Sequence, residues 1–220
     1  MPHLDIGYFK KKTKRRNVSK SRNIENKFIA WKLDKEYYDG KRINGYGGFY
    51  YDGRWKILLK KIIRIYKLNK KLKVLEIGCK KGFLLYDLSL LIPGIKLYGI
   101  ENHKYPLTKI KKSFKKKIYN LPYYELKAFK NKEFDLVIAF NSIYMQNLGD
   151  IIKTLKEIKR VSSHSYISLA SYTNRADREK FLDWTLLGTT ILKKKEWKTI
   201  FDLIGYTGDY YFSDAIKLGL

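Results

Sequence analysis

Short apolar runs alternate along the chain with stretches in which apolar residues recur at helical spacing. The short runs predict buried strands, and the amphipathic stretches predict helices. The predicted strands are 71–77, 95–100, 118–119, 134–140, 166–170, 209–213 and 215–218. The predicted helices are 56–66, 83–91, 104–117, one that runs from a cap at Asn147 or Asp150 to Val161, 181–191 and 195–204. This alternation predicts one parallel sheet with helices on both faces.

The first 40 residues follow a different pattern. Residues 1–30 are polar and basic without sustained periodicity, which predicts an arm that is loose or laid over the surface. Aromatic density rises from Trp31, and residues 42–55 form a loop rich in glycine and aromatic residues. We therefore expect a basic N-terminal extension, residues 1–40, followed by one domain, residues 41–220, which is long enough for a full core.

The turn after the first predicted strand carries the candidate chemistry. Glu76 stands near the end of this strand, Gly78 and Cys79 follow it, and Gly82 precedes the helix. Glycine permits a tight turn and a close approach of a ligand to the backbone, and the helix start presents free N–H groups. The second strand is followed by Glu101, whose carboxylate can accept both hydroxyls of a ribose. The pattern predicts a nucleotide-type site at the carboxyl edge of the sheet.

The pattern E-x-G-x-x-x-G resembles motif I of the class I S-adenosylmethionine-dependent methyltransferases, usually written (D/E)-x-G-x-G-x-G. In that family the glycine loop lies under the methionine part of the cofactor, and Glu101 matches the acid that binds the cofactor ribose. A dinucleotide site would instead need G-x-G-x-x-G. Lys80 stands where the family has its middle glycine. A lysine fits there if its φ is negative, and it brings a positive charge close to the sulfonium.

Further motifs are similar to those of one bacterial subgroup of this family, over about residues 37–212. The matching segments are YGGFYYDGRW at 46–55, KGFLL at 81–85, FDLVI at 134–138, NSI at 141–143 and GYTGDY at 205–210. Members of the subgroup often occur among genes for surface polysaccharides or sugar modification. The resemblance implies a Rossmann-like α/β fold with a mostly parallel seven-stranded sheet, a methyl-transfer reaction and S-adenosyl-L-methionine as cofactor.

The resemblance also implies site residues. Those expected to bind the cofactor are Glu76, Gly78, Cys79, Gly82, Glu101, Asn102, Asn141 and Arg54. Arg54 could clamp the methionine carboxylate or a substrate anion bidentately, and the alternative is a solvated surface arginine. Tyr144 stands where an acceptor would lie, and its ordinary pKa near 10 suits an orienting role better than that of a base. The chain departs from the family at Tyr123-Tyr124, at Tyr144 and at Ala170.

The charge of the chain leaves the acceptor open. Lys and Arg number 47 against 21 Asp and Glu, a net charge of +26, with a dense cluster at residues 10–16. Such a surface attracts nucleic acid, acidic membranes or anionic metabolites, although an A+T-rich genome would also enrich lysine. Three hypotheses remain: a methyltransferase acting on a small-molecule or glycan-linked acceptor, an RNA methyltransferase, or a methyltransferase-like binding protein with weak or no catalysis.

Several other classes of protein lack support in the sequence. Three scattered histidines and one cysteine form no metal-ligand cluster. The single cysteine, Cys79, excludes an internal disulfide framework and fits a reducing cytoplasm. No stretch is long and apolar enough to cross a membrane, and no secretory signal is evident, so we expect a cytoplasmic protein. Hydrolase and Walker A motifs are absent, and residues 141–144 differ from the Asn-Pro-Pro-Tyr signature of DNA adenine methylation.

Overall fold

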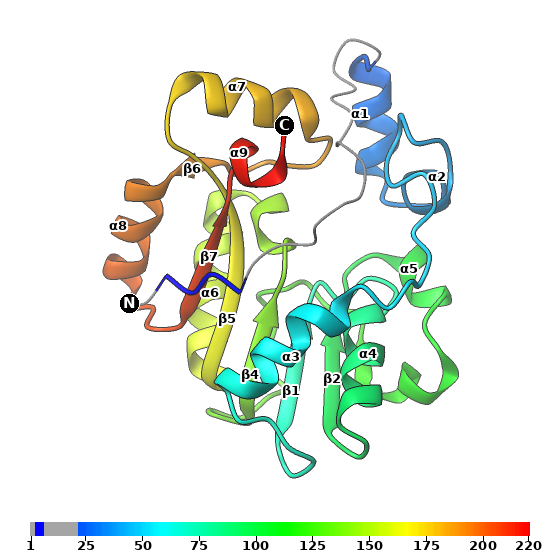
Figure 1. The fold of residues 1–220 in the computed structure, drawn as a ribbon, viewed down its shortest axis with the longest axis vertical. Coiled ribbons are helices and arrows are strands. Elements are labelled where there is room, and N and C mark those ends of the chain that lie inside the picture. Colours follow the sequence, from blue (N-terminus) through cyan, green and yellow to red (C-terminus); the bar gives the residue numbers. More distant parts are fainter. Residues whose placement is uncertain (1–2, 7–21) are drawn as a thin grey trace.

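The computed structural model describes residues 3–6 and 22–220, and the basic cluster at residues 10–16 lies outside them. The described residues form one seven-stranded sheet, which confirms the predicted Rossmann-like fold. The strands lie in the order β3-β2-β1-β4-β5-β6, β7 also pairs with β5, and all pairs are parallel (Figure 1). The strands are β1 (Lys73–Ile77), β2 (Lys96–Ile100), β3 (Ile118–Tyr119), β4 (Phe134–Ala139), β5 (Ser162–Tyr172), β6 (Leu192–Lys193) and β7 (Asp209–Ser213).

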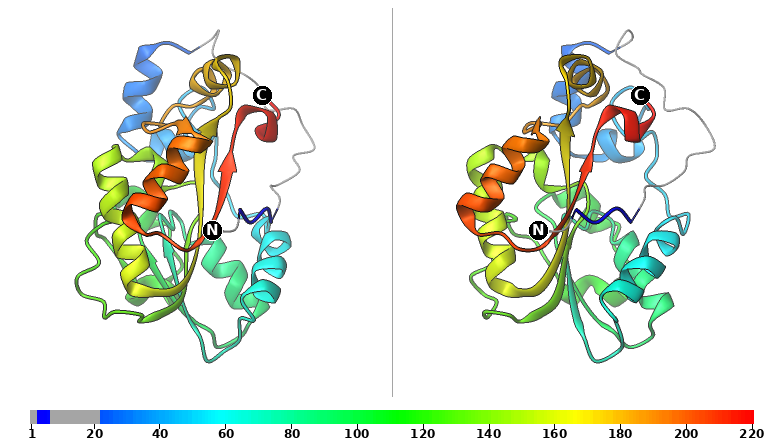
Figure 2. Two further views of the ribbon diagram at one scale, coloured as in Figure 1. Left: turned by 90° about the vertical axis from the view of Figure 1, so that its left-hand side faces the viewer. Right: turned by 60° about the vertical axis from the view of Figure 1, so that its left-hand side comes forward.

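Helices cover both faces of the sheet, as Figure 2 shows from the side. The α-helices are α1 (Ile24–Trp31), α2 (Lys35–Asp39), α3 (Trp55–Ile65), α4 (Phe83–Leu91), α5 (Lys104–Thr108), α6 (Leu148–Val161), α7 (Arg175–Trp184), α8 (Lys194–Ile204) and α9 (Ala215–Leu218). Helices α3 and α4 pack on one face and α6 and α8 on the other. In β1, Val74 points to the first layer and Leu75 to the second, and both are fully buried. This accounts for the continuous apolar runs of the central strands.

The register of the central strands brings three loops together. Ile77 at the end of β1 pairs with Ile100 at the end of β2, and Glu76 pairs with Ile138 of β4. The chain therefore leaves β1, β2 and β4 at the same edge of the sheet. In open parallel sheets this edge, beside the point where the strand order reverses, is where ligands bind.

Two helices have other bounds in the structure than the sequence predicted. The segment 104–117 is α5 followed by a separate 3₁₀ helix, η2 (Lys112–Lys117), with Lys111 extended between them. Its closely spaced lysines repel one another at helical spacing, which disfavours one continuous helix. The predicted helix 181–191 overlaps only the last residues of α7, which begins earlier, at Arg175, and ends at Trp184. The Thr185 hydroxyl then accepts a hydrogen bond from Gly188 N–H in a turn.

The last strands of the sheet also differ from the prediction. Residues 215–218 are helix α9 instead of a strand, because Asp214 caps a helix there by accepting a hydrogen bond from Lys217 N–H at 2.9 Å. The seventh strand is instead β6, which has only two residues. A run this short leaves no readable alternation in the sequence.

The described segments before residue 41, residues 3–6 and 22–40, pack on the rest of the protein. Leu4 N–H donates to the Tyr210 carbonyl at 2.9 Å, so residues 3–6 lie along β7, and Ile6 is buried in the layer of α3 and α4. Of the two predicted alternatives, a loose arm or one laid over the surface, these four residues therefore exclude the loose arm: they lie against the domain, and Ile6 is buried in it. Helices α1 and α2 lie together at one end of the molecule (Figure 1). The boundary at residue 40 stays a prediction. Among the described residues, no helix has the length and apolar character to cross a membrane.

Candidate functional site

The glycine loop connects β1 to α4 in left-handed backbone conformations. Gly78 has a φ of +74°, and a Cβ there would lie 2.3 Å from the Cβ of Ser142. Gly82, the N-cap of α4, has a φ of +73°. The negative φ under which a lysine would fit this position without strain is not present, because Lys80 has a φ of +51°. Such a conformation costs a residue with a Cβ about 1–2 kcal/mol. Gly78 and Cys79 N–H both donate to the Ile100 carbonyl, which ties the loop to the end of β2.

Glu101 holds this loop from the second strand. Its side chain is fully buried. Oε2 accepts a hydrogen bond from Lys80 N–H at 2.8 Å, and Oε1 accepts one from His103 N–H at 3.0 Å. The Nδ1 atom of His103 lies 2.6 Å from the same Oε1. Asn102, between them, is exposed. Both oxygens of the predicted ribose acid are therefore engaged by the protein itself.

The side chains of Glu76, in β1, and of Cys79, in the glycine loop, are both buried. Burial raises the pKa of the Glu76 carboxyl well above its ordinary value, and the neighbouring Glu101 adds to this. Glu76 Oε2 is buried without a hydrogen-bond partner among the described residues. Burial likewise raises the pKa of the Cys79 thiol, which keeps it protonated and unsuited to nucleophilic attack.

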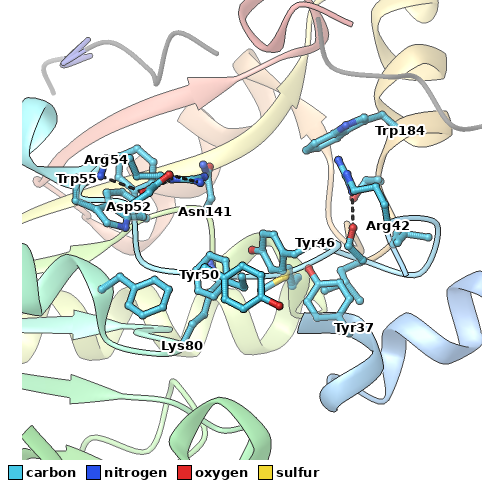
Figure 3. A pocket seen from close by; sticks show the side chains of 18 of the residues that line it. Tyr37, Arg42, Tyr46, Tyr50, Asp52, Arg54, Trp55, Lys80, Asn141 and Trp184 are labelled. Atoms are coloured by element: carbon cyan, nitrogen blue, oxygen red, sulfur yellow. Dashed lines mark hydrogen bonds and ion pairs between the residues drawn. The ribbon is translucent and has the colours of Figure 1, made fainter. Parts of the chain in front are cut away.

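A cavity of about 190 Å³ opens between the glycine loop, the end of β4 and the loops after α2 and α7. Its wall includes Arg22, Tyr37, Arg42, Tyr46, Phe49, Tyr50, Tyr51, Asp52, Arg54, Trp55, Lys80, Phe83, Phe140, Asn141, Tyr144, Met145 and Trp184 to Leu187. In Figure 3, Asp52, Arg54, Trp55 and Asn141 lie at one end, and Arg42 and Trp184 lie at the other. Tyr46 and Tyr50 lie between the two groups.

Asn141 and Arg54 are held in place at the first end. Asn141 follows β4 with a φ of +48°. Its N–H donates to Ser168 Oγ at 2.7 Å, and the same hydroxyl donates to Asn141 Oδ1 at 2.9 Å. Arg54 pairs with Asp52 of its own loop, with Nη2 to Oδ2 at 2.6 Å, and both side chains are nearly half exposed. The hydrogen bonds from Arg54 lower the pKa of Asp52.

Tyr144 lies on the wall of the cavity, between the end of β4 and helix α7. Its ring packs edge-to-face on Phe181 with centroids 6.4 Å apart, and its carbonyl accepts a hydrogen bond from Thr190 N–H at 3.0 Å. Tyr144 therefore shares one cavity with Asn141 and Arg54. The other residues predicted to bind the cofactor do not line that cavity: Glu76, Gly78, Cys79, Gly82, Glu101 and Asn102.

A cluster of aromatic rings, here called the aromatic cover, lies close to Glu101. It consists of Tyr38, Tyr46, Phe49 and Tyr105, whose rings contact one another. Tyr38 stacks on Tyr46 and Tyr105 with ring centroids 5.9 and 6.0 Å apart, and Tyr46 packs on Phe49 at 4.5 Å. Burial, and after it the charge of Glu101, raise the pKa values of Tyr38 and Tyr123. Tyr123 is one of the positions at which the sequence departs from the family, whereas nothing local to Tyr38 predicts its burial near a distant acid.

An ion pair fastens this cover to the glycine loop. Lys81 Nζ lies 2.6 Å from Asp39 Oδ1, with only 5% and 14% of the two side chains exposed. Lys81 also donates to the Phe49 carbonyl at 3.0 Å, and the Tyr105 hydroxyl donates to Asp39 Oδ2 at 2.7 Å. This pair was not predicted from the sequence, although Lys81 is the first residue of the motif at 81–85.

Comparison with known proteins agrees with this geometry. A family described as "Methyltransferase domain" matches residues 68–205. No curated protein matches this sequence. Among solved structures, the chain is similar to a putative methyltransferase of Haloferax volcanii in complex with the Trm112 activator, with 17% identity, a TM-score of 0.56 and coverage of 81% of this chain and 75% of that one.

A second structure is a SAM-dependent methyltransferase from Archaeoglobus fulgidus, with 19% identity, a TM-score of 0.53 and coverage of 75% and 71%. At these identities the likeness shows the fold. The fold and its glycine loop define the class I methyltransferases, which use S-adenosylmethionine as methyl donor. This chain belongs to the family of methyltransferase domains, through residues 68–205.

The two ends of the expected cofactor site fit this donor differently. The part of the site expected to hold the methionine group fits, because the cavity reaches Lys80, Phe83 and Asn141. In addition, the buried Oε2 atom of Glu76 has no hydrogen-bond partner among the described residues. The ribose end is closed in this conformation, because Glu101 is fully buried and its two carboxylate oxygens accept hydrogen bonds from Lys80 N–H and His103 N–H. Binding of the whole cofactor through Glu101 therefore requires the residues that bury Glu101 to move.

Proposed function

We propose that this protein transfers a methyl group from S-adenosylmethionine to a small-molecule or glycan-linked acceptor. The observation that carries the proposal is the cavity of about 190 Å³, which reaches the glycine loop at Lys80 and Asn141 after β4 and is walled largely by aromatic side chains. Such a space suits a small ring-bearing group. The motifs at 46–55 and 205–210, which are similar to those of a bacterial subgroup tied to sugar modification, support the same class of acceptor.

In this proposal the protein supplies alignment more than covalent chemistry. The sulfonium of the donor is already activated, so the main task is to hold the acceptor in line with the methyl group. Tyr144, on the cavity wall, would orient the acceptor, while Glu76, Gly78, Cys79, Gly82, Glu101, Asn102, Asn141 and Arg54 would bind the donor. A donor made inside the cell and the single buried thiol favour a cytoplasmic location.

Calorimetry with S-adenosylmethionine and its demethylated product tests the donor site. We expect both to bind, and Glu101→Gln to weaken binding by about 1–3 kcal/mol, because a charge-assisted hydrogen bond to the ribose is lost. Glu25→Gln, at an exposed position in the first turn of α1, is the matched control and should bind as the wild type does. Thermal unfolding of both variants separates lost binding from lost folding. If the folded wild type binds neither ligand at millimolar concentration, the proposal fails.

A second candidate, RNA methylation, rests on charge. The chain carries +26, and exposed lysines gather in the segment from α5 to η2, where Lys111 Nζ lies 3.3 Å from the ring centroid of Tyr86. An RNA partner predicts an affinity that falls steeply with salt, since bound phosphates release counterions. Binding that is absent or insensitive to salt would remove this candidate. Donor binding without turnover of any acceptor would favour the third hypothesis, a methyltransferase-like binding protein.

A further inference from the structure

Two arginines stand at the end of the cavity away from the glycine loop. Arg22 precedes α1, and Arg42 lies in the loop after α2. Arg22 donates to the carbonyls of Ile43 at 2.9 Å, Trp184 at 2.8 Å and Arg42 at 3.3 Å. Arg42 donates to the carbonyl of Gly45. Neutral peptide groups, rather than carboxylates, therefore hold both guanidinium groups in position.

The charges on the cavity wall do not balance. The cationic residues are Arg22, Arg42, Arg54 and Lys80, and the one acid among the lining residues, Asp52, pairs with Arg54. In residues 3–6 and 22–220, no carboxylate forms an ion pair with Arg22 or Arg42. Burial, and after it the like charge of Arg42, lower the pKa of Arg22 to about 10. Arg22 therefore keeps its charge at neutral pH, and an anion bound between Arg22 and Arg42 would offset the repulsion between these two like charges.

The geometry also provides donors for such an anion. A guanidinium has five N–H groups in a planar fork that matches carboxylate and phosphate oxygens. Arg22 uses its Nε, Nη1 and Nη2 atoms for single bonds to carbonyls, which leaves N–H groups on both terminal nitrogens. Trp184 lies beside Arg42 and adds an aromatic wall (Figure 3). A molecule anchored here would extend past Tyr46 and Tyr50 toward Asn141 (Figure 3).

We infer that the methyl acceptor carries an oxyanion, carboxylate or phosphoryl, that binds to Arg22 and Arg42 while its reacting atom points toward Asn141 and the glycine loop. That the bound molecule is the methyl acceptor rests on the proposed function, whereas the anion site itself rests only on the two arginines and the cavity. The assignment narrows the substrate class from any small molecule to an anionic one.

Calorimetry with inorganic phosphate and with 4-hydroxybenzoate, an aromatic carboxylate, tests the site at constant ionic strength. We expect one of the two probes to bind the wild type, and which one binds distinguishes a phosphoryl group from a carboxylate. Arg42→Gln should weaken binding about tenfold or more, equivalent to about 1.4 kcal/mol. Arg42→Lys, which keeps the charge but loses the fork, should weaken it less. Arg64→Gln on the exposed end of α3 removes the same charge elsewhere and should change nothing.

The outcomes separate this inference from the proposed function. Arg22 fastens α1 to the loop after α7, so Arg22→Lys is measured together with its thermal unfolding. Each variant is also titrated with the demethylated cofactor, whose affinity Arg42→Gln should leave unchanged. If neither probe binds at millimolar concentration, or if Arg42→Gln and Arg64→Gln behave alike, the anion site is wrong even where the cofactor binds. If a probe binds in the expected pattern and the cofactor does not, the anion site stands and the methyltransferase proposal fails.

Discussion

Removing the charge of Asp39 should destabilise the protein far more than removing an exposed carboxylate. Asp39 accepts hydrogen bonds from Lys81 Nζ through both carboxylate oxygens, at 2.6 and 2.7 Å, from the Tyr105 hydroxyl at 2.7 Å and from Phe49 N–H at 3.1 Å. Only 5% of the Lys81 side chain is exposed. Asp39→Asn nearly preserves the shape but leaves a buried ammonium without its counter-charge.

The structure sets the size of the effect. Breaking a buried ion pair by removing one partner costs about 3–5 kcal/mol, because the remaining charge stays buried. The pair of Arg175 and Glu179 is 2.7 Å long, but its side chains are 92% and 56% exposed. Such a pair contributes about 0–1 kcal/mol, so Glu179→Gln is the matched control. The double variant Asp39→Asn with Lys81→Met should be more stable than Asp39→Asn alone, because it leaves no buried ammonium without a counter-charge.

Urea unfolding followed by circular dichroism measures these differences, with the slope checked for constancy. An Asp39→Asn variant within about 1 kcal/mol of the wild type would refute the reasoning. So would a double variant no more stable than the single one. Burial opposes ionisation of Asp39, but the hydrogen bonds from Lys81 and Tyr105 outweigh it and hold its pKa below the ordinary value. The stabilisation is thus present above about pH 4 and lost as pH falls through the lowered pKa.

Two further substitutions test other parts of the structure. Lys80→Gly should stabilise the protein by up to about 1 kcal/mol in urea unfolding, since relief of a left-handed residue exceeds the added chain entropy; a clear loss of stability would contradict the positive φ. Ile6→Ala should cost about 2–4 kcal/mol, because Ile6 is only 1% exposed against α3. A cost near zero would show that residues 3–6 do not belong to the core.

The framework of the sheet could be predicted because its signals are local. The strand at Val74 to Ile77, the glycine turn and the helix 83–91 follow one another within a few residues, and each obeys its own period. Helix α4 begins and ends where the sequence predicted. The acid at Glu101 was placed correctly after the second strand, beside the loop, because parallel register brings those ends together.

The cover and the arginine end could not be predicted, because their causes lie between distant segments. Tyr38 is buried by rings that follow it by 8 to 67 residues, and Asp39 finds its partner at Lys81. Periodicity carries no information on such pairs. The residues around Arg22 are polar and basic, and only the fold brings the Trp184 carbonyl within hydrogen-bond distance of its guanidinium. The positive φ of Lys80 is likewise set by the bonds that Glu101 and Ile100 impose on the loop.

The position of residues 3–6 beside β7 has a consequence for the order in which the chain assembles. His3 bridges to Tyr210, so a segment synthesised near the start can find its place only after about 200 further residues have been made. Until then Ile6 and the face of α3 that it covers are exposed to the cell. The sheet from β1 to β4 can form earlier from nearby segments. During synthesis, this protein is therefore expected to pass through a stage in which the glycine loop is formed while the apolar face of α3 is still exposed.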